Sequence, residues 1–130
     1  KRGALVLIGV DIIEIERVKK AVKRTPRFLG RVFTSRELSY CMNKANPYPS
    51  LAVRFAAKEA LRKLHPALIA GVRFHDLEVL AGEDGRPQVY LHGEAQQRCR
   101  AEGIGEISIS LAHSREQAIA TAIAKKGVES

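Results

Sequence analysis

The chain has 130 residues, with 22 Lys and Arg against 14 Asp and Glu, and a formal net charge of +8 at neutral pH. This length fits a single domain, residues 1–130, whose core buries roughly two-thirds of the unfolded surface. A hydrophobic content of 45% and a charged content of 28% exclude wholesale disorder. No apolar run approaches the ~20 residues of a spanning helix, so we expect no membrane-spanning segment.

The basic charge is concentrated in the first half of the chain. Residues 1–64 carry 15 basic and 5 acidic residues, whereas residues 65–130 carry 7 and 9. The charged residues between positions 17 and 31 are all basic, namely Arg17, Lys19, Lys20, Lys23, Arg24, Arg27 and Arg31. Such a block attracts nucleic acid, an acidic membrane surface, an acidic protein or phosphates, although a solvated helix face would give the same pattern.

The first half of the chain predicts one strand and three helices. The apolar, β-branched run Ala4–Ile12 is typical of a buried strand. In the helix predicted over Glu14–Arg24, the apolar residues recur at spacings of three and four, which leaves most basic residues on the other side. Thr34 is an N-cap signal for a short helix over Ser35–Asn43, and Leu51–Leu64 is the strongest helix-forming segment.

The second half predicts four short strands and a helix. Strands over Asp76–Ala81 and Gln88–His92 flank an Asp-Gly pair, which is a hairpin signal. A helix over Glu94–Glu102, stopped by a glycine, precedes strands over Glu106–Ala112 and Gln117–Ala124. Because the elements show no βαβ rhythm, we predict an α+β fold with a largely antiparallel sheet and a long central helix.

The two cysteines, Cys41 and Cys99, lie far apart in the sequence. Their spacing matches neither a metal-binding nor a redox motif. We therefore expect reduced thiols and a cytoplasmic location.

Asp11 is the first candidate for chemistry. It closes an apolar run, where a carboxylate is costly to desolvate unless it is paired, hydrogen-bonded or bound to a metal. The structural alternative is an N-cap for a helix starting near Ile13, and the two roles are compatible.

Glu59 is the only acid among Arg54, Lys58, Arg62 and Lys63 on the predicted long helix. One carboxylate flanked by cations is suited to holding Mg²⁺ and a polyphosphate together, because the acid binds the metal while Lys and Arg take the outer phosphate oxygens. The simpler alternative is a surface salt bridge between Glu59 and Lys63, which are i,i+4, contributing roughly a few tenths of a kcal/mol.

His113 follows the strand predicted over Glu106–Ala112. A lone histidine at a strand end is either structural or part of a site, and its position alone leaves both open. The sequence has neither a Walker-type glycine loop nor a Gly-x-Ser-x-Gly elbow, so the usual nucleotide triphosphatases and serine hydrolases have no support.

Taken together, these motifs resemble the holo-[acyl-carrier-protein] synthases, the short, single-domain type of 4′-phosphopantetheinyl transferase. The resemblance covers nearly the whole chain, in the family's order, and rests on Ile8-Gly9-Val10-Asp11-Ile12, Glu16-Arg17, Arg54-Phe55-Ala56-Ala57-Lys58-Glu59-Ala60 with Lys63, and Ser110-Leu111-Ala112-His113. It implies Mg²⁺-dependent transfer of 4′-phosphopantetheine from coenzyme A to a serine of apo acyl carrier protein, with release of adenosine 3′,5′-bisphosphate. It also implies a place in fatty acid or polyketide biosynthesis and a homotrimer with shared active sites.

The resemblance further implies the roles of individual residues. Asp11 and Glu59 match the metal ligands, and Lys63 and His113 match further catalytic positions. Coenzyme A is expected to contact Arg54, Lys63, Gly85, Arg86, Pro87, Ser110 and His113. The acidic acyl carrier protein is expected to dock on Arg17, Arg24, Arg27 and Phe28, where complementary charge would speed the encounter.

Two positions depart from the family pattern. Ala112 stands where a second serine is common, and Gln117 stands where an aromatic residue is common. Both changes bear on the coenzyme pocket and not on the proposed metal ligands.

Two other functions compete with this interpretation: a small basic nucleic-acid-binding module, and an inactive relative that only binds the carrier protein. Aromatic residues make up only 5% of the chain, which argues against a platform for stacking bases. The retained Asp11, Glu59, Lys63 and His113 argue against an inactive relative.

Overall fold

The computed structural model describes residues 2–129. The strands are β1 (Arg2–Glu14), β2 (Leu77–Ala81), β3 (Pro87–Leu91), β4 (Ile104–His113) and β5 (Gln117–Glu129). The helices are α1 (Ile15–Arg24), α2 (Phe28–Val32), α3 (Ser35–Met42), α4 (Tyr48–Arg62) and α5 (Gly93–Glu102), with 3₁₀ turns η1 (Pro66–Leu68) and η2 (Phe74–Asp76). Within the described residues, no helix has the length and apolar character needed to cross a membrane.

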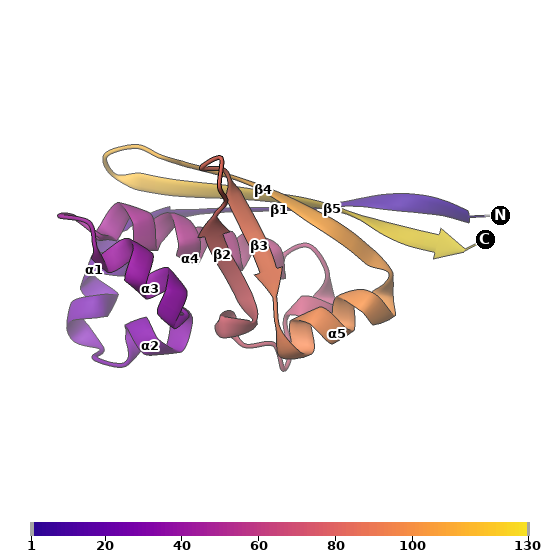
Figure 1. The fold of residues 1–130 in the computed structure, drawn as a ribbon, viewed down its shortest axis with the longest axis horizontal. Coiled ribbons are helices and arrows are strands. Elements are labelled where there is room, and N and C mark those ends of the chain that lie inside the picture. The colour runs from indigo at the N-terminus through magenta and orange to yellow at the C-terminus, as the bar shows by residue number, and fades with distance from the viewer. Residues whose placement is uncertain (1, 130) are drawn as a thin grey trace.

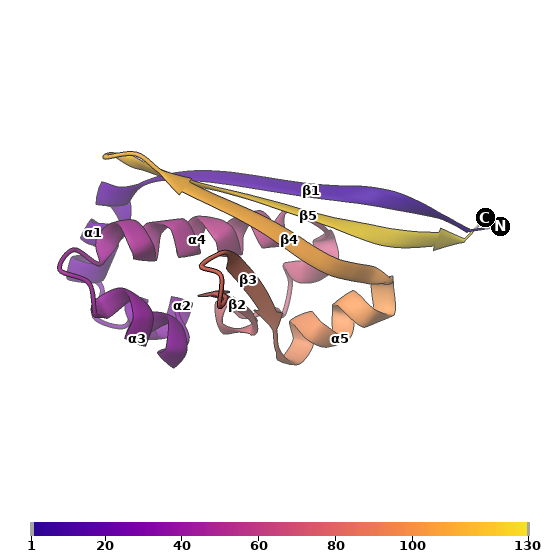
Figure 2. The same ribbon diagram turned by 45° about the horizontal axis from the view of Figure 1, so that its top comes forward.

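The strands form two antiparallel sheets, where the sequence predicted one. A three-stranded sheet has the order β1-β5-β4, and β2 pairs only with β3. The ladder between β1 and β5 runs from Arg2 opposite Glu129 to Glu14 opposite Gln117. Figures 1 and 2 show the three long strands as one layer over α4, with the β2–β3 hairpin beside this helix. The α+β class and the long central helix are confirmed.

Small residues let α4 approach the sheet closely. The inward-facing positions of β5 are alanines, and Ala118, Ala120 and Ala122 are fully buried. On β1, a Cβ added at Gly9 would lie 2.0 Å from the carbonyl oxygen of Ala60. Only glycine therefore fits where β1 crosses α4.

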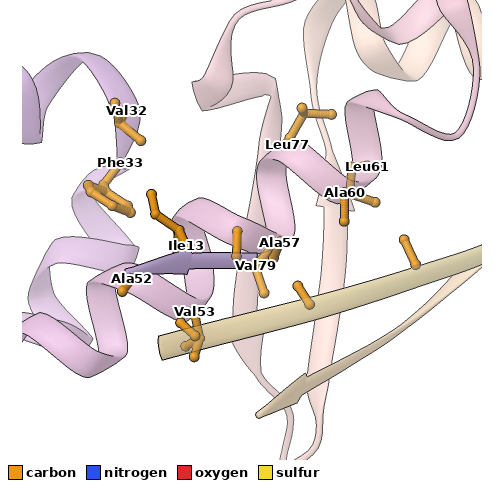
Figure 3. Close-up of a cluster of buried hydrophobic side chains, with 14 of the residues drawn as sticks. Ile13, Val32, Phe33, Ala52, Val53, Ala57, Ala60, Leu61, Leu77 and Val79 are labelled. Carbon is orange, nitrogen blue, oxygen red and sulfur yellow. The ribbon is translucent and has the colours of Figure 1, made fainter. Parts of the chain in front are cut away.

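Larger side chains fill the space between α4, the hairpin and the first helices. Phe33, Leu51, Leu61, Leu77 and Val79 are almost fully buried there. Figure 3 shows Phe33, Leu77 and Val79 from other elements beside Leu61 of α4. Helix α4 is thus the centre of the core.

Several local predictions are confirmed. Thr34 and Glu37 form a reciprocal capping box at the start of α3. Gly103 ends α5 in the left-handed region at φ 70°. The Asp-Gly hairpin also forms, with Gly85 at φ 84°.

Other local predictions differ from the structure. The sequence predicted no helix over α2, which is only five residues long. Helix α4 begins at Tyr48 rather than Leu51, because a proline is tolerated in the first helical turn. The N-cap position of α1 is Glu14, so Asp11 does not cap this helix.

Candidate active site

Asp11 and Lys63 form an ion pair between β1 and the end of α4. The Lys63 ammonium lies 2.9 Å from Asp11 Oδ1 and donates a second bond of 3.0 Å to the carbonyl oxygen of Val10. The close crossing at Gly9 explains this pairing, because Asp11 is two residues further along β1 and faces the same side of the strand.

Glu59 lies one helical turn before Lys63. The backbone N–H of Lys63 donates to the carbonyl oxygen of Glu59 at 3.2 Å, so their side chains project from neighbouring points of α4. The Glu59 carboxylate contacts Arg62 at 3.8 Å. The predicted alternative of a simple Glu59–Lys63 bridge is wrong, since Lys63 pairs with Asp11 instead.

Asp11 and Glu59 supply the kind of oxygen ligand that a hard divalent cation prefers. The side chains of Asp11 and Glu59 are 17% and 34% exposed, so both remain reachable from solvent. Within residues 2–129, no cluster of three or more His, Cys, Asp or Glu side chains is arranged to hold a metal ion. A two-carboxylate donor set suits Mg²⁺, which binds through one or two carboxylates and completes its shell with water and substrate phosphates.

Lys58 lies outside this group, although it precedes Glu59. Its side chain is fully buried and bonds Glu37 Oε1 at 2.9 Å, the carbonyl oxygen of Leu77 at 2.7 Å and that of Phe74 at 3.0 Å. Burial lowers the pKa of the Lys58 ammonium, and the Glu37 carboxylate acts in the opposite direction. With three acceptors for its three N–H donors, Lys58 has none left for a phosphate, so that part of the prediction is wrong.

A pocket on the other flank of α4 gathers several of the residues predicted to bind coenzyme A. Its volume is about 470 Å³, and its lining includes Arg54, Gly85, Pro87 and His113. These residues come from α4, the β2–β3 turn, β3 and the end of β4, so segments far apart in sequence meet here.

Tyr40 and Lys44 are among the members of this pocket that sequence reasoning missed. The Lys44 ammonium lies 4.8 Å from the Tyr40 ring centroid, and the Arg54 guanidinium lies 4.5 Å from it on the same ring. The only signal was a basic residue in the turn before the long helix, which carries little information by itself.

Arg54 both supports the pocket and faces it. Its Nε donates to the carbonyl oxygen of Val79 at 3.2 Å, and its Nη1 donates to Ser50 Oγ at 2.9 Å. In residues 2–129, no buried side-chain nitrogen or oxygen lacks a hydrogen-bond partner. Among residues 2–129, Nη2 has no acceptor, so part of it reaches solvent, although Arg54 as a whole is only 5% exposed.

Arg86 and Ser110 line a second, larger cleft of about 1040 Å³ between β3, α5 and β4. Pro87 and Leu111 line both this cleft and the smaller pocket, so the two hollows adjoin. The residues predicted to bind coenzyme A therefore lie along one stretch of surface, with the exception of Lys63.

The predicted site thus falls into two parts within one chain. Asp11, Glu59 and Lys63 do not belong to the lining of the pocket that contains Arg54 and His113. Helix α4, packed across β1 and β5, lies between the two groups, as Figure 2 shows for the elements.

The basic residues predicted to contact the carrier protein are exposed. Arg17 and Arg24 lie on α1, and Arg27 lies in the following turn. Phe28 is half-buried instead, with its ring centroid 5.9 Å from that of Phe55 and 6.3 Å from that of Phe33. It belongs to an aromatic row beside the basic surface.

Comparison with known proteins identifies the family. The sequence model of the 4′-phosphopantetheinyl transferase superfamily matches residues 7–122. The holo-[acyl-carrier-protein] synthase of Moorella thermoacetica is 45% identical over 115 residues, covering 88% of this chain and 90% of that protein.

Solved structures agree with this match. The Helicobacter pylori holo-[acyl-carrier-protein] synthase in complex with coenzyme A has a TM-score of 0.75 at 30% identity, covering 91% of this chain and 99% of that chain. The Chronobacterium ammoniagenes complex with coenzyme A has a TM-score of 0.82 at 26% identity, with 94% and 98% covered.

The chain therefore belongs to the 4′-phosphopantetheinyl transferase superfamily, in the holo-[acyl-carrier-protein] synthase branch. It is an enzyme of the phosphopantetheinyl transferase class. The family predicted from its motifs is confirmed.

Proposed function

We propose that this transferase moves 4′-phosphopantetheine from coenzyme A to a serine of apo acyl carrier protein in a Mg²⁺-dependent reaction. The serine oxygen attacks the β-phosphorus of the coenzyme pyrophosphate and forms a new phosphate ester. The bond from that phosphorus to the bridging oxygen breaks, and adenosine 3′,5′-bisphosphate leaves with the electron pair. The serine proton passes to solvent.

The observation that supports this proposal is the Asp11–Lys63 ion pair where β1 crosses α4, one helical turn from Glu59. Asp11 and Glu59 would hold Mg²⁺, which neutralises the charge of the pyrophosphate when it is bound. Lys63 pairs with Asp11, and its half-exposed side chain would also supply a positive charge to a phosphate oxygen. Charge neutralisation and alignment are the main requirements of phosphoryl transfer.

The pocket with Arg54 and His113 is suited to the adenosine bisphosphate end of coenzyme A. Lys44 and the free Nη2 of Arg54 supply cationic donors for a phosphate, and Gly85 and Pro87 offer a small, apolar wall. A volume of about 470 Å³ lies within the range of small-ligand sites. Arg86 and Ser110 extend this surface into the adjoining cleft.

The exposed basic face of α1 is suited to an acidic carrier protein. Arg17, Arg24 and Arg27 are free of carboxylate partners among the ion pairs of the described residues. Unpaired charge of one sign attracts the opposite sign over several ångströms and orients the encounter.

A homotrimer would explain the outer face of the three-stranded sheet. This face exposes a continuous set of branched apolar residues, each 37–62% exposed: Val6, Ile8, Val10 and Ile12 on β1, and Ile119 and Ile123 on β5. Monomers rarely leave such a contiguous patch in water, and a second copy of the chain offers a matching apolar partner.

Shared active sites would follow from this assembly. The carboxylate group and the coenzyme pocket of one chain lie on opposite flanks of α4, so each is free to combine with the complementary part of a neighbour. We place the enzyme in the cytoplasm, in fatty acid or polyketide biosynthesis, and its two buried free thiols fit that location.

The direct test is to incubate the protein with apo acyl carrier protein, coenzyme A and Mg²⁺ and to measure the intact mass of the carrier. We expect a mass gain of one phosphopantetheine group and stoichiometric adenosine 3′,5′-bisphosphate. A carrier of unchanged mass, beside a competent control synthase, would contradict the proposal. Addition of a chelator should stop the reaction, and excess Mg²⁺ should restore it.

A further inference from the structure

Helix α4 serves as a partner for the open edge of β2. Arg54 Nε donates to the carbonyl oxygen of Val79 at 3.2 Å, and Lys58 Nζ donates to that of Leu77 at 2.7 Å. Residues four apart on a helix lie ~6 Å apart, which matches the ~6.6 Å between alternate residues of a strand. Between these bonds, the N–H of Val79 donates to Glu37 Oε2 at 2.8 Å.

Lys58 is the most restrained side chain in this arrangement. Its ammonium links α4 to three other elements, through Glu37 of α3, Phe74 of η2 and Leu77 of β2. All of these contacts are directional hydrogen bonds in a dry interior. A buried ion pair adds little net stability, because desolvation opposes the attraction, but it does favour one geometry over others.

The opposite side of α4 is held by different contacts. There the helix meets the alanines of β5 and the backbone at Gly9, and Lys63 at its end bonds Asp11 and the carbonyl oxygen of Val10. Apolar contact is non-directional, and the Lys63 side chain is 55% exposed, so these contacts fix the rotation of α4 less firmly than buried hydrogen bonds do. The buried bonds of Lys58 are therefore a main restraint on that rotation.

Glu59 follows Lys58 directly, about 100° further round the helix. A carboxylate at roughly 6 Å from the axis moves by about 2 Å when the helix turns by about 20°. Errors of about 1 Å at a reacting centre can cost about 100-fold in rate.

We propose that Lys58 is a positioning residue for the transfer reaction, which fixes the rotation of α4 and so holds Glu59 and Lys63 toward Asp11. This inference rests on the metal and phosphate roles proposed above for these three residues. Lys58 itself contacts neither metal nor substrate.

The test compares two variants that differ only at Lys58. Glu37→Gln keeps a single acceptor oxygen, which can accept from Lys58 but not from Val79 as well, and Lys58 retains the carbonyl oxygens of Leu77 and Phe74. We expect this variant to be less stable than wild type but to fold, with a rate within about twofold of wild type. Lys58→Met with Glu37→Gln removes the three donors without leaving a buried charge. We expect this variant to unfold cooperatively, with kcat at least about tenfold lower and KM for the carrier nearly unchanged.

A second readout does not depend on turnover. Electron paramagnetic resonance measures Mn²⁺ binding in the presence of coenzyme A. The Mn²⁺ affinity of the double variant should be at least about threefold lower than that of Glu37→Gln. Val72→Ala, which creates a cavity in the core without removing a partner of Lys58, controls for lost stability and should keep wild-type Mn²⁺ affinity. If the Lys58→Met variant fails to fold, Lys58→Gln is measured in its place, and we expect the same losses of kcat and Mn²⁺ affinity.

Wild-type kcat and Mn²⁺ affinity in the folded double variant would overturn the inference and leave Lys58 a structural role only. Glu59→Gln, measured in parallel, separates this failure from failure of the proposed function. A normal rate in Glu59→Gln would refute the metal assignment, and with it the reason given for Lys58.

Discussion

Lys63 and Asp11 are joined by a 2.9 Å ion pair that links β1 to the end of α4. The side chain of Lys63 is 55% exposed, so the pair contributes little to stability, on the order of 0–1 kcal/mol. Its importance lies in the chemistry, because it places a carboxylate and an ammonium one helical turn from Glu59.

Substitution of Asp11 by Asn should therefore separate activity from folding. We expect the rate of phosphopantetheine transfer to fall by at least about 100-fold, since an amide is a weak ligand for Mg²⁺. The free energy of unfolding should change by less than about 1 kcal/mol. Intact-mass kinetics and urea unfolding measure the two quantities, and a near-normal rate in Asp11→Asn would refute its role as a ligand.

Gly9 should be the least replaceable glycine of β1. Gly9→Ala places a methyl group against the carbonyl of Ala60, and we expect it to destabilise the fold by about 3 kcal/mol or more and to reduce activity. Gly3→Ala is the matched control, because an added Cβ there meets no atom within 4 Å. Thermal unfolding of both variants tests this, and equal melting temperatures would contradict the close crossing.

Reversal of charge on α1 should affect the carrier protein and not the coenzyme. For Arg24→Glu we expect KM for acyl carrier protein to rise about fivefold to tenfold at low ionic strength. The effect should shrink in high salt, while KM for coenzyme A stays constant as the internal control. If KM for acyl carrier protein is the same in Arg24→Glu and wild type, α1 is only a solvated basic face.

Glu78 should dominate stability in acid. Burial by itself would raise its pKa, but hydrogen bonds from Arg36, Thr34 and His92 lower it to about 2. Because this value lies below the ordinary 4.5, the stabilisation is complete above about pH 4.5 and is lost as the pH falls toward 2.

Below pH 4.5, the unfolding free energy of Glu78→Gln should therefore fall less than that of wild type, by roughly 1–2 kcal/mol. This figure is reduced because Arg36 and His92 are exposed. Urea unfolding between pH 3 and pH 6 measures it. If the unfolding free energy of Glu78→Gln falls with decreasing pH as steeply as that of wild type, other carboxylates cause the acid sensitivity.

The sequence carried more information about which elements hold the candidate site residues than about the neighbours of those residues. The elements that carry Asp11, Glu59, Lys63 and His113 could be predicted because each residue lies beside a strong local signal, such as a strand end or an alanine-rich helix. The opposite environments of Lys58 and Lys63 could not be predicted, since both are lysines on one cation-rich helix. What separates them is the open edge of β2, a tertiary feature that no helical periodicity encodes.

The division of the strands into two sheets was hidden for a similar reason. The hairpin signal at Gly85 identifies β2 and β3 as partners, but their distance from β5 depends on α4, which covers the edge of β2 through Arg54 and Lys58. Lys44 and Tyr40 were missed because only the fold brings them beside Arg54.

In the proposed assembly, a complete site combines the carboxylates of one chain with the coenzyme pocket of another. The most direct measurement mixes two inactive proteins, Glu59→Gln and the double variant Lys44→Ala with His113→Ala, and lets their subunits exchange. We expect activity to return in roughly a quarter of the sites, since random exchange gives that share two intact parts. A mixture no more active than the sum of its two components would contradict the shared site.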